Sequence, residues 1–271
     1  TKKEVDMMKS KCTSFGLRTL AIVESFLRML PVFLVAVAAL VLSAAASEAN
    51  VIELEDAEVI IEINATDGDA GFHTFVDGEA WYKMKLRAPN GRIILEVNTS
   101  RNLRRQGLVE WFFESDEPGF DEQPIEEFLS RFSEGTYTFH GRTSKGDRLV
   151  GEAKLTHNLP AGPEITSPTE GQVVDPDSDL IVEWEEVTED FRGGALDSPI
   201  VRYQLAVEFE DKESDPPGKE VLTIDVPPDE FSASIPAEFL KPGREYKVEV
   251  GAREKSGNQT FTETTFTTAP L

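Results

Sequence analysis

Thiol chemistry is almost absent from this sequence, which has 271 residues and a single cysteine, Cys12. Cys12 lies upstream of the longest apolar run, so a chain that loses this run by processing keeps no thiol. Such a chain cannot form a disulfide, a thiolate metal site or a cysteine nucleophile. A lipoprotein anchor would need a cysteine just after the apolar run, and none is there.

Basic residues are also scarce, since 27 Lys and Arg stand against 50 Asp and Glu and give a formal net charge of −23. This charge excludes nucleic acid as the ligand, because binding a phosphate backbone needs clustered Lys and Arg. The acidic residues are spread along the chain, which is typical of a solvated, mutually repelling surface. Cation binding and a saline habitat are the alternatives.

Catalytic signatures are missing as well. The chain has three histidines, His73, His140 and His157, and no two of them have the short spacing of a helical zinc site. The sequence contains no H-E-x-x-H, no nucleophile elbow, no P-loop and no dinucleotide-binding glycine motif. Carboxylates are abundant, but nothing singles out a general acid and base pair. We therefore expect a protein that is not an enzyme.

The longest apolar run, residues 29–42, is preceded by Arg18 and Arg28 and followed by small residues. A basic flank, a short apolar core and small residues before a polar chain describe a secretory signal peptide, with cleavage after Ala46 or Ala49. The alternative is an uncleaved membrane anchor, because the run is close to the lower length limit of a span. We expect a secreted or periplasmic protein that meets a membrane only if this segment stays uncleaved.

Alternating apolar and polar side chains, typical of half-buried β-strands, dominate residues 47–158. Val59, Ile61 and Ile63 form one such set, and Asn90-Gly91 between two further runs predicts a hairpin, because both residues tolerate positive φ. We expect residues 47–158 to form an antiparallel β-sandwich of uncertain family, immunoglobulin-like in character. Residues 1–46 before it comprise the signal peptide and an upstream extension.

A proline-punctuated linker, residues 159–163, separates this region from a second strand-rich region, residues 164–271. The linker is short and stiff, so the two regions should keep a nearly fixed spacing. In the second region the turn Pro242-Gly243 precedes a strand that starts near Tyr246 and alternates with period two. A tyrosine in this position is the layout of a tyrosine corner, in which the phenol hydrogen-bonds back to upstream backbone.

With Trp184 on an earlier predicted strand and Tyr246 after the turn, residues 161–269 resemble a fibronectin type III module of a secreted bacterial protein. The resemblance implies a core tryptophan at Trp184 and a two-layered scaffold, but it implies no activity. The loop 255–258 lacks the Arg-Gly-Asp by which some family members bind integrins. The expected fold class is therefore all-β, with two tandem antiparallel β-sandwiches after an N-terminal signal helix.

The first region faintly echoes the second. Phe128-Leu129, Gly135 and Tyr137 come before a closing hairpin, as Phe239-Leu240, Gly243 and Tyr246 do in the second region. The order of small turn, aromatic residue and hairpin supports a second sandwich in the first region.

One acidic stretch stands out within the first region. Asp67 and Asp69 follow a predicted strand, and Asp77 and Glu79 come shortly after them. Calcium prefers several oxygen ligands, and loops with glycine let carboxylates converge. These four residues are candidate calcium ligands, and calcium is the one cofactor that the sequence suggests. The alternative is a pair of turns that use Asp and Gly for their backbone tolerance.

Four aromatic residues, Trp81, Trp111 and Phe112-Phe113, suggest a platform for stacking on a carbohydrate. Aromatic side chains of a small sandwich more often fill its core, and a buried Trp111 would remove the platform. We expect an exported binding, adhesion or spacer protein of the cell envelope with a protein or carbohydrate partner. The alternative is an enzyme or accessory module with calcium- or carbohydrate-binding chemistry in the first region.

Overall fold

The computed structural model describes residues 49–211 and 218–270. Residues 50–271 form one compact unit. The predicted signal peptide and its upstream extension, residues 1–46, lie outside the described residues. No helix of the described part is long and apolar enough to cross a bilayer.

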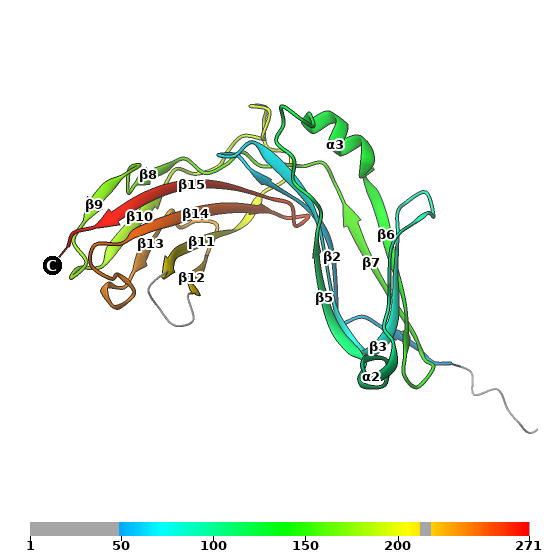
Figure 1. Ribbon diagram of the computed structural model, residues 1–271. Helices are drawn as coiled ribbons and strands as arrows, with labels where there is room; N and C mark the ends of the chain where they lie inside the picture. Colours follow the sequence, from blue (N-terminus) through cyan, green and yellow to red (C-terminus); the bar gives the residue numbers. More distant parts are fainter. Residues whose placement is uncertain (1–48, 212–217, 271) are drawn as a thin grey trace, which may run out of the picture. The chain divides into compact units, whose positions relative to one another are not determined.

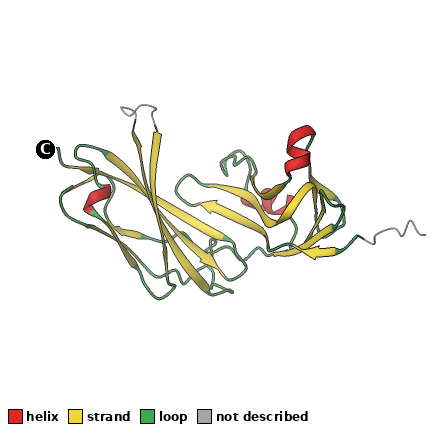
Figure 2. Cartoon of the chain, turned by 90° about the horizontal axis from the view of Figure 1, so that it is seen from below, coloured by secondary structure: helices red, strands yellow, loops and turns green. Residues whose placement is uncertain are grey.

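The prediction of an all-β fold is confirmed, as Figures 1 and 2 show. The first half of the described chain contains β1 Val51–Glu53, β2 Asp56–Asn64, β3 Asp69–Arg87, β4 Ile93–Asn98, α2 Arg101–Gln106, β5 Leu108–Glu114, α3 Ile125–Arg131, β6 Gly135–Thr143 and β7 Arg148–Leu155. The second half contains β8 Ile165–Ser167, β9 Gln172–Val174, β10 Leu180–Trp184, β11 Ile200–Asp211, β12 Gly218–Val226, β13 Ser232–Ile235, the 3₁₀ turn Ala237–Phe239, β14 Glu245–Glu254 and β15 Gln259–Thr268.

The long strand β3 organises the first half. Up to Asp77 it pairs with β2 on one side and β5 on the other. From Trp81 onward it pairs with β6, and from Lys83 with β4, while Trp81 also lies opposite Leu108 of β5. The register shifts between Asp77 and Trp81, where Gly78 lets Leu54 approach, since an added Cβ would lie 3.0 Å from the Leu54 side chain. A shift of this kind bends a strand and increases its twist. One strand therefore serves two sets of partners around a shared core.

The core of the first half follows the predicted alternation. Val59, Ile61 and Ile63 are buried to 2 % exposure or less, and they pack with side chains from β3, β6 and β7. Trp81 and Trp111 belong to the same core, with their rings edge to face at 5.7 Å. The carbohydrate platform on these tryptophans is therefore wrong, because both rings are covered by the packing of the sandwich.

The second half is a two-layered sandwich. One layer has the order β13-β10-β8, and the other contains β12, β11, β14 and β15 side by side, with β9 along β15. Trp184 and Tyr246 are buried in one hydrophobic cluster between these layers. The inward orientation predicted for both residues is confirmed.

The two sandwiches are joined through their backbones. Residues 259–261 of β15 run parallel to residues 62–64 of β2, with Gln259 opposite Glu62 and Phe261 opposite Asn64. Each half still has its own hydrophobic cluster. The predicted domain boundaries, 47–158, 159–163 and 164–271, stay predictions.

Candidate functional site at the junction of the two sandwiches

Asn258 lies in the turn between β14 and β15 and is 1 % exposed. Its Oδ1 accepts a hydrogen bond from the backbone N–H of Ile61 at 2.8 Å. Its Nδ2 donates to the carbonyl oxygens of Thr156 at 2.9 Å and Asn158 at 3.0 Å. One buried amide thus ties the second sandwich to β2 and to the chain that leaves β7, and its own polar atoms are satisfied.

The turn that presents Asn258 is shaped by Glu254, which is fully buried. The Glu254 carboxylate accepts hydrogen bonds from the backbone N–H groups of Ser256 at 2.8 Å and Asn258 at 3.2 Å, and from the Ser256 hydroxyl. Burying a carboxylate is costly unless it is hydrogen-bonded, and here the turn itself supplies the donors. The Ser256 hydroxyl also lies 2.5 Å from that of Thr156 in the first sandwich.

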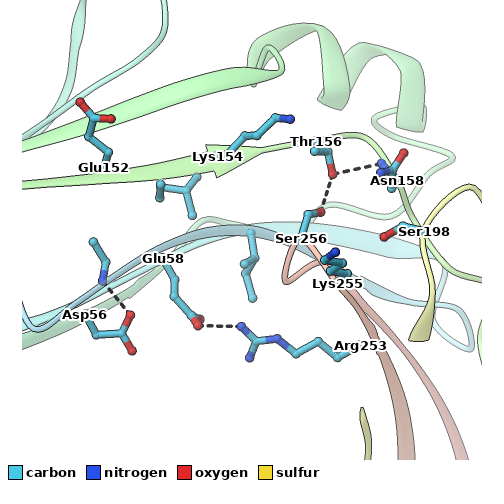
Figure 3. A pocket seen from close by; sticks show the side chains of 14 residues that line it. Asp56, Glu58, Glu152, Lys154, Thr156, Asn158, Ser198, Arg253, Lys255 and Ser256 are labelled. Atoms are coloured by element: carbon cyan, nitrogen blue, oxygen red, sulfur yellow. Dashed lines mark hydrogen bonds and ion pairs between the residues drawn. The ribbon is translucent and has the colours of Figure 1, made fainter. Parts of the chain in front are cut away.

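A pocket of about 540 Å³ opens beside this turn, between β2, β7 and the end of β14 (Figure 3). Arg253 of β14 pairs with Glu58 of β2 at 2.8 Å across it. Lys154, Lys255 and Glu152 also line the pocket, so its charge is mixed. These contacts add an ion pair to the hydrogen bonds that hold the two sandwiches together.

A second pocket of about 430 Å³ is strongly acidic. Its lining includes six carboxylates, Glu62, Asp67, Asp69, Glu117, Glu249 and Glu263, and the other lining residues are Asn64, Gln204, Lys247, Gln259 and Phe261. Lys247 is the one basic residue of this described lining. The pocket collects acids from both sandwiches because the outward-facing residues of β2 and β3 continue onto β15 and β14 through the β2–β15 pairing.

Several acids of this pocket resist ionisation. Burial, with the neighbouring charges of Asp67 and Glu263, raises the pKa of Asp69. Burial also raises the pKa of Glu249, against the opposing effect of Lys247. Burial would lower the pKa of Lys247, but its bonds to the surrounding glutamates raise it instead. Lys247 thus offsets part of the repulsion among the acids.

The four predicted calcium ligands do not come together. Asp69 lies opposite Asn64 at one end of the β2–β3 hairpin, and Asp77 lies opposite Asp56 at the other end. Asp69 and Asp77 are eight positions apart along an extended strand, which is about 26 Å at ~3.3 Å per position. Asp67 and Asp69 line the acidic pocket, whereas Asp77 and Glu79 are not among its lining residues. Calcium binding by the Asp67–Asp69 pair stays a prediction.

The acidic pocket adjoins a histidine that the sequence did not single out. His73 is 4 % exposed, and its Nε2 lies 3.3 Å from Oε1 of Glu117. Its Nδ1 lies 3.9 Å from Oε2 of Glu62, and Glu114 is its cross-strand neighbour on β5. Glu62 and Glu117 also line the pocket. Burial raises the pKa of Glu117, and its hydrogen bond to His73 opposes the rise.

The chain matches no protein-family model and no curated protein sequence. Among solved structures it is similar to fibronectin(III)-like modules of Clostridium thermocellum CbhA, at 12 % identity, 80 % coverage of this chain, 92 % of that chain and a TM-score of 0.32. It is also similar to the chicken CNTN1 FN1-FN3 domains, at 13 % identity over 82 % of this chain and 66 % of that one, with a TM-score of 0.28. A 1.5-MDa bacterial ice-binding adhesin gives 14 % identity, coverages of 79 % and 65 %, and a TM-score of 0.27. Likenesses this low carry no argument about what the chain does.

Proposed function

We propose that this chain is an exported, non-enzymatic binding or spacer protein of the cell envelope, in which a fibronectin type III sandwich is fused rigidly to a second sandwich. The single observation that carries the proposal is the buried Asn258, which bonds to Ile61, Thr156 and Asn158 of the first sandwich. A spacer must hold its two ends at a set distance, and a flexible joint would defeat that purpose. A buried amide with satisfied hydrogen bonds supports a fixed joint, because opening it would expose several backbone groups.

The partner that we propose is a protein or carbohydrate of the envelope. Sandwiches display their loops on a rigid frame, which suits the presentation of a binding surface. The acids that line the junction favour a partner that carries basic groups, because complementary charge steers encounter and suppresses wrong partners.

The fixed joint is tested by the distance between two spin labels. Cysteines replace Ser144, in the β6–β7 turn, and Ser234, on β13, which are both exposed. The full chain carries them in a Cys12→Ser background, which leaves these two as its thiols. We expect one narrow distance distribution from pulsed electron resonance. A broad or multiple distribution would contradict the rigid spacer.

Asn258→Leu should broaden the same distribution, because it leaves the Ile61 N–H and two carbonyl oxygens without their partner. Asn102→Leu is the matched control, since Asn102 is exposed on α2. If Asn102→Leu broadens the distance distribution as well, the broadening does not measure loosening of the joint between the sandwiches.

A second candidate function is an enzyme or accessory module with calcium chemistry in the first sandwich. This candidate is favoured by the raised pKa values of Asp69 and Glu117, which line one pocket, because active sites often perturb acids in this way. Calorimetric titration of the full chain with calcium tests it. Heat that is lost in Asp69→Asn would support this candidate, and no heat with the unaltered chain would reject calcium.

A further inference from the structure

Beyond the proposed spacer role, His73 and two glutamates converge on the outward face of the β2–β3–β5 sheet. His73 lies on β3, Glu114 lies opposite it on β5, and Glu117 follows β5 in the next loop. One ligand atom from each of the three residues lies within 4.8 Å of the others. The His73 imidazole is buried, Glu114 is exposed and Glu117 is half-buried. An ion from solvent can therefore reach the three residues from the side of the glutamates.

Carboxylate oxygens lie near both ring nitrogens of His73. Nε2 faces Glu117 at 3.3 Å and Nδ1 faces Glu62 at 3.9 Å. A neutral imidazole offers one lone pair to a metal ion, and a carboxylate offers oxygen ligands. The ligand atoms of His73 and Glu117 therefore already face one another, as two ligands of one cation do.

Gly71 leaves the space in which the side chains of His73 and Glu117 meet. A Cβ on Gly71, two residues before His73 on the same face of β3, would lie 1.9 Å from Oε1 of Glu117 and 2.6 Å from Nε2 of His73. A side chain at this position would push the two apart. Glycine in a strand interior often marks a place where another group approaches the backbone closely.

The distance between the two ligand atoms also fits a metal. Two atoms that each lie ~2.05 Å from a tetrahedral zinc ion are about 3.3 Å apart, and the Nε2–Oε1 distance is 3.3 Å. We propose that His73, Glu114 and Glu117 bind one divalent transition-metal ion of the zinc class. Three protein ligands leave a fourth position for water or for a group of a partner.

The ligand types separate this site from the calcium prediction. Calcium takes six to eight oxygen ligands, whereas a set of one imidazole and two carboxylates suits zinc and its neighbours. Asp67 and Asp69 contribute oxygens only. The two sites therefore differ in the ion that each prefers.

The test is calorimetric titration of the untagged full chain with zinc chloride, because an affinity tag of histidines would bind zinc itself. We expect one zinc ion to bind per chain. The heat of zinc binding should be unchanged in the presence of excess calcium. His73→Asn should abolish the binding, and Glu117→Gln should weaken it at least tenfold. Gly71→Ala should weaken it as well, since the new Cβ displaces Glu117. If His73→Asn abolishes zinc binding but Glu117→Gln leaves it unchanged, the assignment of three ligands is overturned.

His140→Asn is the matched control, because His140 is exposed on β6 and belongs to no such cluster among the described residues. It should bind zinc as the unaltered chain does. Circular dichroism checks that each variant is folded. No zinc binding by the unaltered chain, equal binding by the folded His73→Asn, or displacement of zinc by calcium would each overturn the proposal.

Discussion

The phenol of Tyr246 donates a hydrogen bond to the carbonyl oxygen of Phe239 at 3.0 Å, seven residues upstream. The phenol oxygen of Tyr246 in turn accepts a hydrogen bond from the backbone N–H of Lys241 at 2.7 Å. This is the tyrosine corner that the sequence predicts, and it is confirmed. In the first sandwich Tyr137 makes a similar bond to the carbonyl oxygen of Ser133 at 3.1 Å. The echo between the two halves of the sequence therefore has a counterpart in their hydrogen bonds.

Tyr246→Phe should lower the free energy of unfolding by about 1.5 kcal/mol, because it removes the two hydrogen bonds that the hydroxyl makes with the Lys241 N–H and the Phe239 carbonyl oxygen. The ring is fully buried and would stay in place, so the loss isolates the hydroxyl. Urea titration followed by fluorescence measures the change. Tyr82→Phe is the control, because its ring packs under Arg104 at 3.9 Å and its hydroxyl makes no hydrogen bond to any described residue. An equal loss in both variants would argue against a special role of the corner.

The sequence predicted well those features that depend on local pattern. Val59, Ile61 and Ile63 are buried because a strand turns alternate side chains to one face, and this needs no knowledge of the partner strand. Trp184 and Tyr246 follow the same rule in the second sandwich. The sequence did not predict that β3 is continuous, because Asp77-Gly78 is a pattern typical of a turn. In the fold, Gly78 lies within the bent strand and leaves space for the side chain of Leu54.

The candidate site could not be read from the sequence in the same way. His73 and Glu117 are 44 residues apart in sequence and meet only because β5 pairs with β3. Asn258 and Ile61 are 197 residues apart. Asp69 and Asp77, in contrast, are close in sequence and far apart along one strand. Sequence proximity does not bring Asp69 and Asp77 together, because an extended strand places residues that are close in sequence far apart in space.

Lys247 lies among three glutamates and should contribute to stability. Its Nζ contacts Glu208 at 3.7 Å and Glu263 at 3.2 Å, and it also pairs with Glu249. Lys247→Met keeps much of the aliphatic stem but removes the cation that Glu249 and Glu263 share, while Glu208 keeps its ion pair with Lys219. We therefore expect a loss of about 1 kcal/mol in the free energy of unfolding. Urea titration at low and high salt measures it. The loss should shrink at high salt, because added ions screen the remaining repulsion.

The control for this charge change is Lys145→Met, in the exposed turn between β6 and β7. It removes one positive charge without touching the glutamate cluster. A loss of stability as large as that of Lys247→Met would assign the effect to net charge rather than to the cluster.

Gly251 makes room for the ring of Phe261. A Cβ at Gly251 would lie 2.4 Å from the nearest ring carbon of Phe261, its neighbour across the β14–β15 pair. Gly251→Ala must therefore displace the ring, and we expect it to cost about 1–2 kcal/mol in urea titration. Gly218→Ala on β12 is the matched control, because no atom of the described residues lies within 4 Å of its added Cβ. Equal stability of the two variants would show that the ring moves aside at no cost.

The raised pKa of Asp69 makes the free energy of unfolding depend on pH. Burial and the charges of Asp67 and Glu263 raise its pKa in the folded chain above the ordinary value of 3.8. The folded state therefore binds a proton more tightly than the unfolded state, and stability falls as pH rises from 3.8 through the folded pKa. At neutral pH the full penalty applies.

Asp69→Asn removes this penalty. We expect the variant to be more stable than the unaltered chain at about pH 7, by about 0.5 kcal/mol after allowance for solvent screening. The difference should vanish at about pH 3, where the unfolded-state carboxyl is also protonated. Urea titrations at both pH values measure it, and Asp229→Asn, at an exposed turn position, serves as the control. A variant that is less stable than the unaltered chain at neutral pH would mean that the Asp69 carboxylate is favourably bound rather than repelled.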